Sequence, residues 1–229
     1  MTAEERQAMW WQPVPSGRVL VTVGVATDGD TFTRRDEAGR PARGGDYFER
    51  TRADIARHDP EKPDEKALYL QQVGIPYLAC AQAWEAVGAR MAVIDSLAAF
   101  AREIEDAAVV IHLSHGGRLY AQFGDDYADA DELKAALAPT GISVISLVCC
   151  YSRNFAVGIA NETGIKVQGF DDFAPEIPVF AGFWSLVAAQ FGREGYYMTA
   201  VETVARAVLG QIQEEEQKEG DIENSVKSS

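Results

Sequence analysis

Cysteine and histidine are scarce in this chain, with three residues of each among 229. Two of the three cysteines are adjacent, so they cannot build the disulfide framework of a small secreted protein. Residues 1–6 do not resemble a secretory signal peptide. We therefore expect a protein that works in the reducing cytoplasm.

Long apolar runs and an excess of basic residues are also missing. The longest apolar stretches are shorter than a segment that spans a bilayer. The 35 Asp and Glu residues outnumber the 21 Lys and Arg residues, and the formal net charge is −14. Such a charge disfavours nucleic acid as a partner. We expect no membrane and no nucleic-acid partner, and the charge favours cationic protein partners or substrates.

No histidine follows the cysteine pair, because all three histidines precede Cys149 and Cys150. Papain-like peptidases and glutamine-amidotransferase-like hydrolases place the thiol before the histidine, so this chain lacks their base. A phosphatase loop needs an arginine six positions after its cysteine, where this chain has Phe155 or Ala156. These three classes of enzyme are excluded.

The chain does contain a regular alternation of predicted strands and helices. Short apolar runs typical of buried strands lie at about 18–26, 90–95, 109–113, 142–148 and 165–169. Helical spacing, capping residues and glycine stops predict helices at about 76–87, 96–104, 129–138, 152–164, 179–191 and 199–215. This alternation favours an α/β fold with a mostly parallel sheet that is covered on both faces.

The length is sufficient for one α/β domain with a substantial core, and we expect a single domain over residues 1–229. A charged segment at about 27–66, interrupted by Gly and Pro, predicts a surface insertion that proteases can reach. From about residue 214 the mixture of charge with Gly, Asn and Ser predicts a flexible acidic tail.

Candidate catalytic residues stand where two of the predicted strands end. Strand 109–113 leads to His115 and Gly116, and strand 142–148 leads to Cys150. Parallel α/β sheets carry their chemistry at the carboxyl ends of the strands, so we expect the imidazole and the thiol to meet there. A neighbouring imidazole can activate a thiol as a nucleophile. Because Gly116 has no side chain, its N–H could form an oxyanion hole with the N–H of Cys150.

These two motifs, Leu113-Ser114-His115-Gly116 and the run 146–152, resemble those of caspase-like cysteine peptidases, most closely their prokaryotic CHAT branch. In that family one strand ends in His-Gly, and the next ends in a small residue, Cys, any residue and then Ser or Gly. The resemblance covers residues 90–210 approximately. It implies a three-layer α/β/α sandwich with a mostly parallel sheet.

The resemblance also implies the chemistry. Cys150 would be the nucleophile and His115 the base of a dyad that cleaves protein or peptide substrates. A thiol protease of this kind needs no cofactor and no metal. A regulatory protein partner is compatible with it.

The chain differs from two branches of the family at specificity positions. Val148 stands where metacaspases have an aspartate, and the caspase motif Gln-Ala-Cys-Arg-Gly is absent. Asp171 and Asp172, which follow strand 165–169, are instead the candidates for a pocket that binds Arg or Lys before the scissile bond. Aspartates at a strand end are also ordinary turn formers, so both interpretations stay open.

The remaining histidine and cysteine residues have structural interpretations. His112 lies inside a predicted strand, so we expect a hydrogen-bonded core residue. Cys149 should point to the opposite side of the strand from Cys150. Cys80 lies on the apolar side of its helix with Trp84, and we expect it in the core.

Two other functions compete with the peptidase hypothesis. One is a caspase-like fold that has lost its activity and acts as a binding or scaffolding module. The other is a different α/β thiol enzyme or a flavodoxin-like binding domain. That last alternative predicts a large distance between His115 and Cys150.

Overall fold

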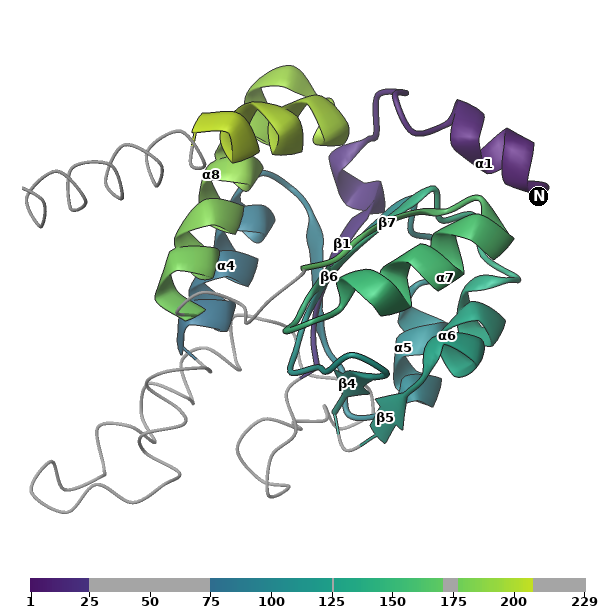
Figure 1. Ribbon diagram of the computed structural model, residues 1–229. Coiled ribbons are helices and arrows are strands. Elements are labelled where there is room, and N and C mark those ends of the chain that lie inside the picture. The colour runs from purple at the N-terminus through teal and green to yellow at the C-terminus, as the bar shows by residue number, and fades with distance from the viewer. Residues whose placement is uncertain (25–74, 125, 171–176, 208–229) are drawn as a thin grey trace, which may run out of the picture.

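The computed structural model describes residues 1–24, 75–124, 126–170 and 177–207 (Figure 1). The predicted insertion at about 27–66, the predicted tail from about 214, and both Asp171 and Asp172 lie outside the described residues. Within the part that is described, no helix is both long and apolar enough to span a membrane.

A sheet of five parallel strands forms the centre of the fold (Figure 1). Its spatial order is β2-β1-β3-β6-β7, so β1, β3 and β6 are flanked by strands on both sides. The bounds are β1 Val19–Val23, β2 Arg90–Val93, β3 Val109–Leu113, β6 Val144–Val148 and β7 Lys166–Gln168. The predicted α/β class and mostly parallel sheet are confirmed.

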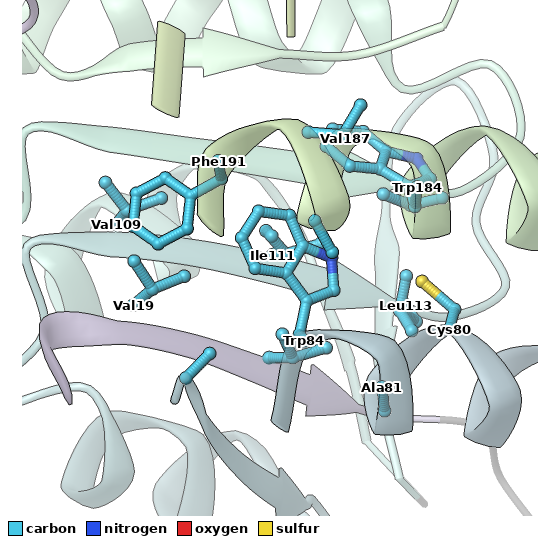
Figure 2. Packing of buried hydrophobic residues seen from close by; sticks show 14 of the residues in the cluster. Val19, Cys80, Ala81, Trp84, Val109, Ile111, Leu113, Trp184, Val187 and Phe191 are labelled. Atoms are coloured by element: carbon cyan, nitrogen blue, oxygen red, sulfur yellow. The ribbon is translucent and has the colours of Figure 1, made fainter. Parts of the chain in front are cut away.

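Helices cover both faces of the sheet (Figure 1). Consecutive strand residues pack into opposite layers. One face packs against α4 (Ile75–Ala86) and α8 (Ile177–Glu194), and the other against α5 (Leu97–Glu103), α6 (Ala130–Leu137) and α7 (Arg153–Thr163). Figure 2 shows Trp84 of α4 and Phe191 of α8 on the first face, over Val109 and Ile111, with ring centroids 5.5 Å apart. Val110, between those two strand residues, packs into the second layer.

A small antiparallel hairpin interrupts the alternation between β3 and α6. It consists of β4 (Ala121–Phe123) and β5 (Asp126–Ala128). Gly124 turns between them at φ 68°, and a Cβ there would lie 2.2 Å from the backbone of Asp95. Only glycine combines this backbone angle with so close an approach.

Most of the predicted helix boundaries are confirmed. The Ser96 side chain accepts the N–H of Ala99 at the start of α5, and Asp129 forms a capping box with Glu132 at the start of α6. Gly164 ends α7 in the left-handed conformation, at φ 71°.

Two predicted boundaries and one unpredicted helix show where local signals fail. The helix start predicted at about residue 199 is wrong, because the last described helix already runs over 197–207. Tyr197, its first residue, is buried in the core. Ser152 precedes α7 as predicted but makes no side-chain cap. The short helix α1 (Ala3–Ala8) begins at a Thr2–Glu5 capping box that was not predicted.

Candidate active site

β3 and β6 are hydrogen-bonded neighbours, and one candidate catalytic residue follows each of them. Leu113 pairs with Val148, and the N–H of Ser114 donates to the carbonyl of Val148 at 3.2 Å. His115 and Cys150 each follow the end of this ladder by two residues, so both come directly after the same edge of the sheet. Leu113 and Val148, the last paired residues, both pack in the layer of α4 and α8.

The sheet order bears on the alternative functions. Counted along the chain, the five strands have the order 2-1-3-4-5, which is common among doubly wound sheets and changes winding direction between β1 and β3. The alternative of a different α/β thiol enzyme or a flavodoxin-like binding domain predicts that His115 and Cys150 are far apart. The strands that precede these two residues are adjacent, and the strand order is also that of flavodoxin-like domains, so the sheet order is compatible with both functions.

The two candidate residues are only partly buried, which distinguishes them from the strand residues before them. Cys150 and His115 have intermediate exposure. Burial lowers the pKa of His115 from its usual 6.5. The neutral imidazole therefore predominates at pH 7, and this is the form that accepts a proton from a thiol.

Cys149 packs in the layer of α5, α6 and α7, opposite to that of Val148, and is fully buried. Burial raises the pKa of its thiol to about 12, while hydrogen bonds with the hydroxyls of Ser152 and Ser114 act in the other direction. A thiol with so high a pKa stays protonated and is a poor nucleophile at neutral pH. Of the adjacent cysteines, Cys150 is the one suited to chemistry.

Gly116 makes room for the buried thiol. A Cβ at Gly116 would lie 2.7 Å from Sγ of Cys149 and 3.2 Å from the carbonyl oxygen of Tyr120. Packing thus gives a structural reason for this glycine, besides the oxyanion hole predicted from the sequence. The sequence could not reveal it, because it depends on the neighbouring strand.

The loop after His115 folds back on itself as a narrow hairpin. Gly116 forms a β-bridge with Ala121, flanked by a bond from the N–H of Gln122 to the carbonyl of His115 and one from the N–H of Gly117 to the carbonyl of Tyr120. The N–H of Gly116 takes part in neither of these two bonds. This is the amide that the oxyanion-hole prediction requires.

The turn after Cys150 is organised by the buried hydroxyl of Ser152. Its oxygen lies 3.1 and 2.9 Å from the carbonyl oxygens of Leu147 and Cys149, which share its single proton, and it accepts the N–H of Phe170 at 3.1 Å. The N–H of Arg153 in turn donates to the carbonyl of Phe170. Phe170 is therefore held beside the turn that carries Cys150, although Asp171 and Asp172 lie outside the described residues.

His112 is the core residue that its place in the strand predicts. It is fully buried, with Nδ1 2.8 Å from the hydroxyl of Thr22 and Nε2 2.7 Å from the carbonyl of Gln122. Its ring stacks on Phe123 with centroids 4.2 Å apart. Since a carbonyl only accepts, Nε2 carries the proton and Nδ1 accepts from Thr22. Burial lowers the pKa of His112 to about 4, which keeps the ring neutral.

The structure places three residues near the site that the sequence does not distinguish. The hydroxyl of Tyr77, on α4, donates to the carbonyl of Ser114 at 3.2 Å and so holds the backbone just before His115. The guanidinium carbon of Arg118 lies 5.5 Å from the centroid of the Tyr151 ring. No local signal distinguishes these residues from ordinary core or surface positions.

A cavity of about 470 Å³ lies elsewhere, between α5 and α6. Its lining residues, which include Glu105 and Thr140, belong to segments that lead into the amino ends of β3 and β6. It is therefore at the end of the sheet opposite His115 and Cys150. Among the described residues, no three His, Cys, Asp or Glu side chains are grouped so that they could hold a metal ion.

No protein-family model matches this chain, and no curated protein does.

Proposed function

We propose that the protein is a cysteine endopeptidase with Cys150 as nucleophile and His115 as base. The observation that carries the proposal is the pairing of β3 with β6, which supports it because the segments that follow these two strands, with His115 and Cys150, begin at the same carboxyl edge of the sheet. Both residues are partly exposed, and the pKa of His115 is lowered by burial. An accessible thiol beside a neutral imidazole is the arrangement that thiol hydrolases use.

The chemistry follows from these two groups. The Cys150 sulfur attacks the carbonyl carbon of the scissile peptide bond while His115 takes the thiol proton. When the tetrahedral intermediate collapses, the C–N bond breaks and His115 returns the proton to the leaving amine. His115 then activates a water molecule that hydrolyses the thioester and releases Cys150. The N–H groups of Gly116 and Cys150 stabilise the oxyanion, for which donors of this kind contribute about 3–4 kcal/mol each.

We assign the fold to the caspase-like type, CHAT branch, on the same residues. The order of the two motifs on neighbouring parallel strands supports this assignment, as do the helices on both faces of the sheet. Ser152 matches the Ser or Gly of the family's cysteine motif. In this chain its hydroxyl stabilises the turn that carries Cys150 by bonding the carbonyls of Leu147 and Cys149.

A preference for Arg or Lys before the scissile bond is part of the proposal. It rests on Asp171 and Asp172 in the sequence, and the bond between Arg153 and Phe170 supports it by holding the preceding residue beside the nucleophile turn. A carboxylate in a site shielded from solvent discriminates strongly for a guanidinium. Fluorogenic peptides varied at that position should be cleaved fastest with Arg or Lys. Asp171→Asn or Asp172→Asn should reduce the preference.

The test of the function itself is cleavage of a proteome-derived peptide library. New amino termini should form with the wild-type protein and should be absent with both Cys150→Ala and His115→Ala. If the wild type cleaves nothing and an electrophilic peptide probe does not label it, the protein is not this peptidase. That result would favour the binding or scaffolding module.

A further inference from the structure

Tyr151, the residue directly after Cys150, has an unusual backbone conformation. Its φ is 53°, and it is the one residue other than glycine with a positive φ in the part of the chain that the structure describes. A bulky residue is disfavoured in this left-handed region and stays there only when its surroundings hold it. The peptide that carries the candidate nucleophile therefore adjoins a strained turn.

The Tyr151 ring contacts the loop that follows the candidate base. Arg118, three residues after His115, has its guanidinium carbon 5.5 Å from the ring centroid, within the range of a cation–π contact. Arg118 is an exposed residue. One contact thus joins the loop after β3 to the turn after β6.

The loop that presents Arg118 is stiffened on both sides. The N–H of Gly117 donates to the carbonyl of Tyr120 at 2.9 Å and closes the turn around Arg118. A Cβ at Gly117 would lie 2.9 Å from the Tyr120 ring, so that ring covers the turn. Tyr120 also packs edge-to-face on Tyr127 of β5, with centroids 5.2 Å apart. These contacts hold the backbone at Arg118 in place, so its side chain extends from a fixed position.

We propose that Arg118 is a positioning residue for the nucleophile: its guanidinium holds the Tyr151 ring, and through it the left-handed turn that directs the Cys150 thiol. This inference rests on the proposed function of Cys150. The partner of Arg118 is the aromatic ring, so the contact needs a cation on one side and a π-face on the other. Arg118→Lys and Tyr151→Phe preserve both requirements, whereas Arg118→Gln and Tyr151→Leu each remove one.

The experiment measures two quantities on the full chain. The first is the rate at which iodoacetamide alkylates Cys150, followed by peptide mass spectrometry across pH. The second is kcat and KM for a cleaved peptide. Arg118→Gln and Tyr151→Leu should each lower the alkylation rate and kcat by about three- to fivefold, with KM unchanged. Arg118→Lys and Tyr151→Phe should stay close to wild type, as should Arg102→Gln, a control at another exposed arginine.

The double variant decides whether the two residues act as a unit. Arg118→Gln combined with Tyr151→Leu should be no slower than either single variant. Multiplied effects would show independent roles and overturn the proposal. A rise in KM alone, with alkylation unchanged, would overturn it too, because Arg118 would then bind substrate directly. Lack of peptide cleavage, with an alkylation rate that still responds to Arg118, would contradict the proposed function and leave the positioning role supported.

Discussion

The interior of the sheet and its carboxyl edge hold the same types of residue under different conditions. His112 is fully buried and His115 half-buried, although they are three positions apart; Cys149 is buried and its neighbour Cys150 partly exposed. In the interior, burial brings the pKa of His112 to about 4 and that of Cys149 to about 12. Both groups therefore stay neutral near pH 7. Depth in the sheet, more than residue type, separates the structural groups from the candidate catalytic groups here.

The largest expected effect concerns which of the two adjacent cysteines reacts with a thiol reagent. Cys150→Ala should abolish labelling by a thiol-directed peptidyl electrophile, because the accessible thiol is removed. Cys149→Ala should retain labelling, because its thiol is buried and protonated. Mass spectrometry of the labelled peptide checks both variants. Label that is lost with Cys149 instead would reverse the assignment.

The same contrast applies to activity at the histidines. His115→Ala should lower kcat/KM by about 10²- to 10⁴-fold, the usual contribution of a general base. Its thermal unfolding should stay near that of wild type, since the side chain lies at the sheet edge and not in the core. Peptide hydrolysis and circular dichroism on the same sample measure the two effects. Unchanged hydrolysis would exclude the dyad.

His112→Ala should act on stability. The substitution removes a stacked ring and leaves the Thr22 hydroxyl and the Gln122 carbonyl without their partner. Together these losses should lower the free energy of unfolding by about 3–4 kcal/mol. Urea denaturation measures the change. A loss below about 1 kcal/mol would mean that the site is less tightly packed than described.

The burial of His112 also predicts how the free energy of unfolding depends on pH. Between its unfolded pKa of 6.5 and its folded pKa of about 4, His112 binds more protons in the unfolded state. The free energy of unfolding should therefore fall as pH decreases through this window, by at most about 3 kcal/mol for this group. Carboxylates contribute similarly to wild type and to His112→Gln, so the difference between their urea midpoints against pH isolates the histidine. Parallel curves would contradict the prediction.

The smallest expected effect concerns Gly116, which lies at the edge of the sheet next to the buried thiol of Cys149. Gly116→Ala should lower the free energy of unfolding by about 1–3 kcal/mol, because the new methyl group overlaps the Cys149 thiol. Adding Cys149→Ala should restore part of that loss, since it removes Sγ, the nearer of the two Cys149 atoms that the methyl group would meet. Thermal unfolding of the two single variants and the double variant tests the coupling. Additive losses would show that the thiol is not the obstacle.

Much of the fold could be predicted from the sequence because its signals are local. The apolar run of β3 was located to the residue, and β6 to within two residues of its start. The caps at Ser96 and Asp129 need only a side chain and amides a few residues away. The helix predicted from about residue 199 starts instead at Tyr197, a residue buried in the core among residues distant in the sequence.

For the candidate site, the sequence could name His115, Cys150 and Gly116 but could not assess their surroundings. Ser152 was expected at a helix start, yet its hydroxyl bonds the turn after β6 and the N–H of Phe170. The positive φ of Tyr151 has no sequence signal, because side chains other than glycine rarely adopt it.

By itself, then, the sequence determined the strands, most helix ends, the α/β class and the order of the histidine and cysteine motifs, since each depends on neighbours along the chain. Only the tertiary structure decided that β3 and β6 lie side by side, that Cys149 fills the space next to Gly116, and that Arg118 reaches Tyr151. These contacts join residues about 30 positions apart. Their geometry depends on strand order and packing depth, which the local pattern of residues does not encode.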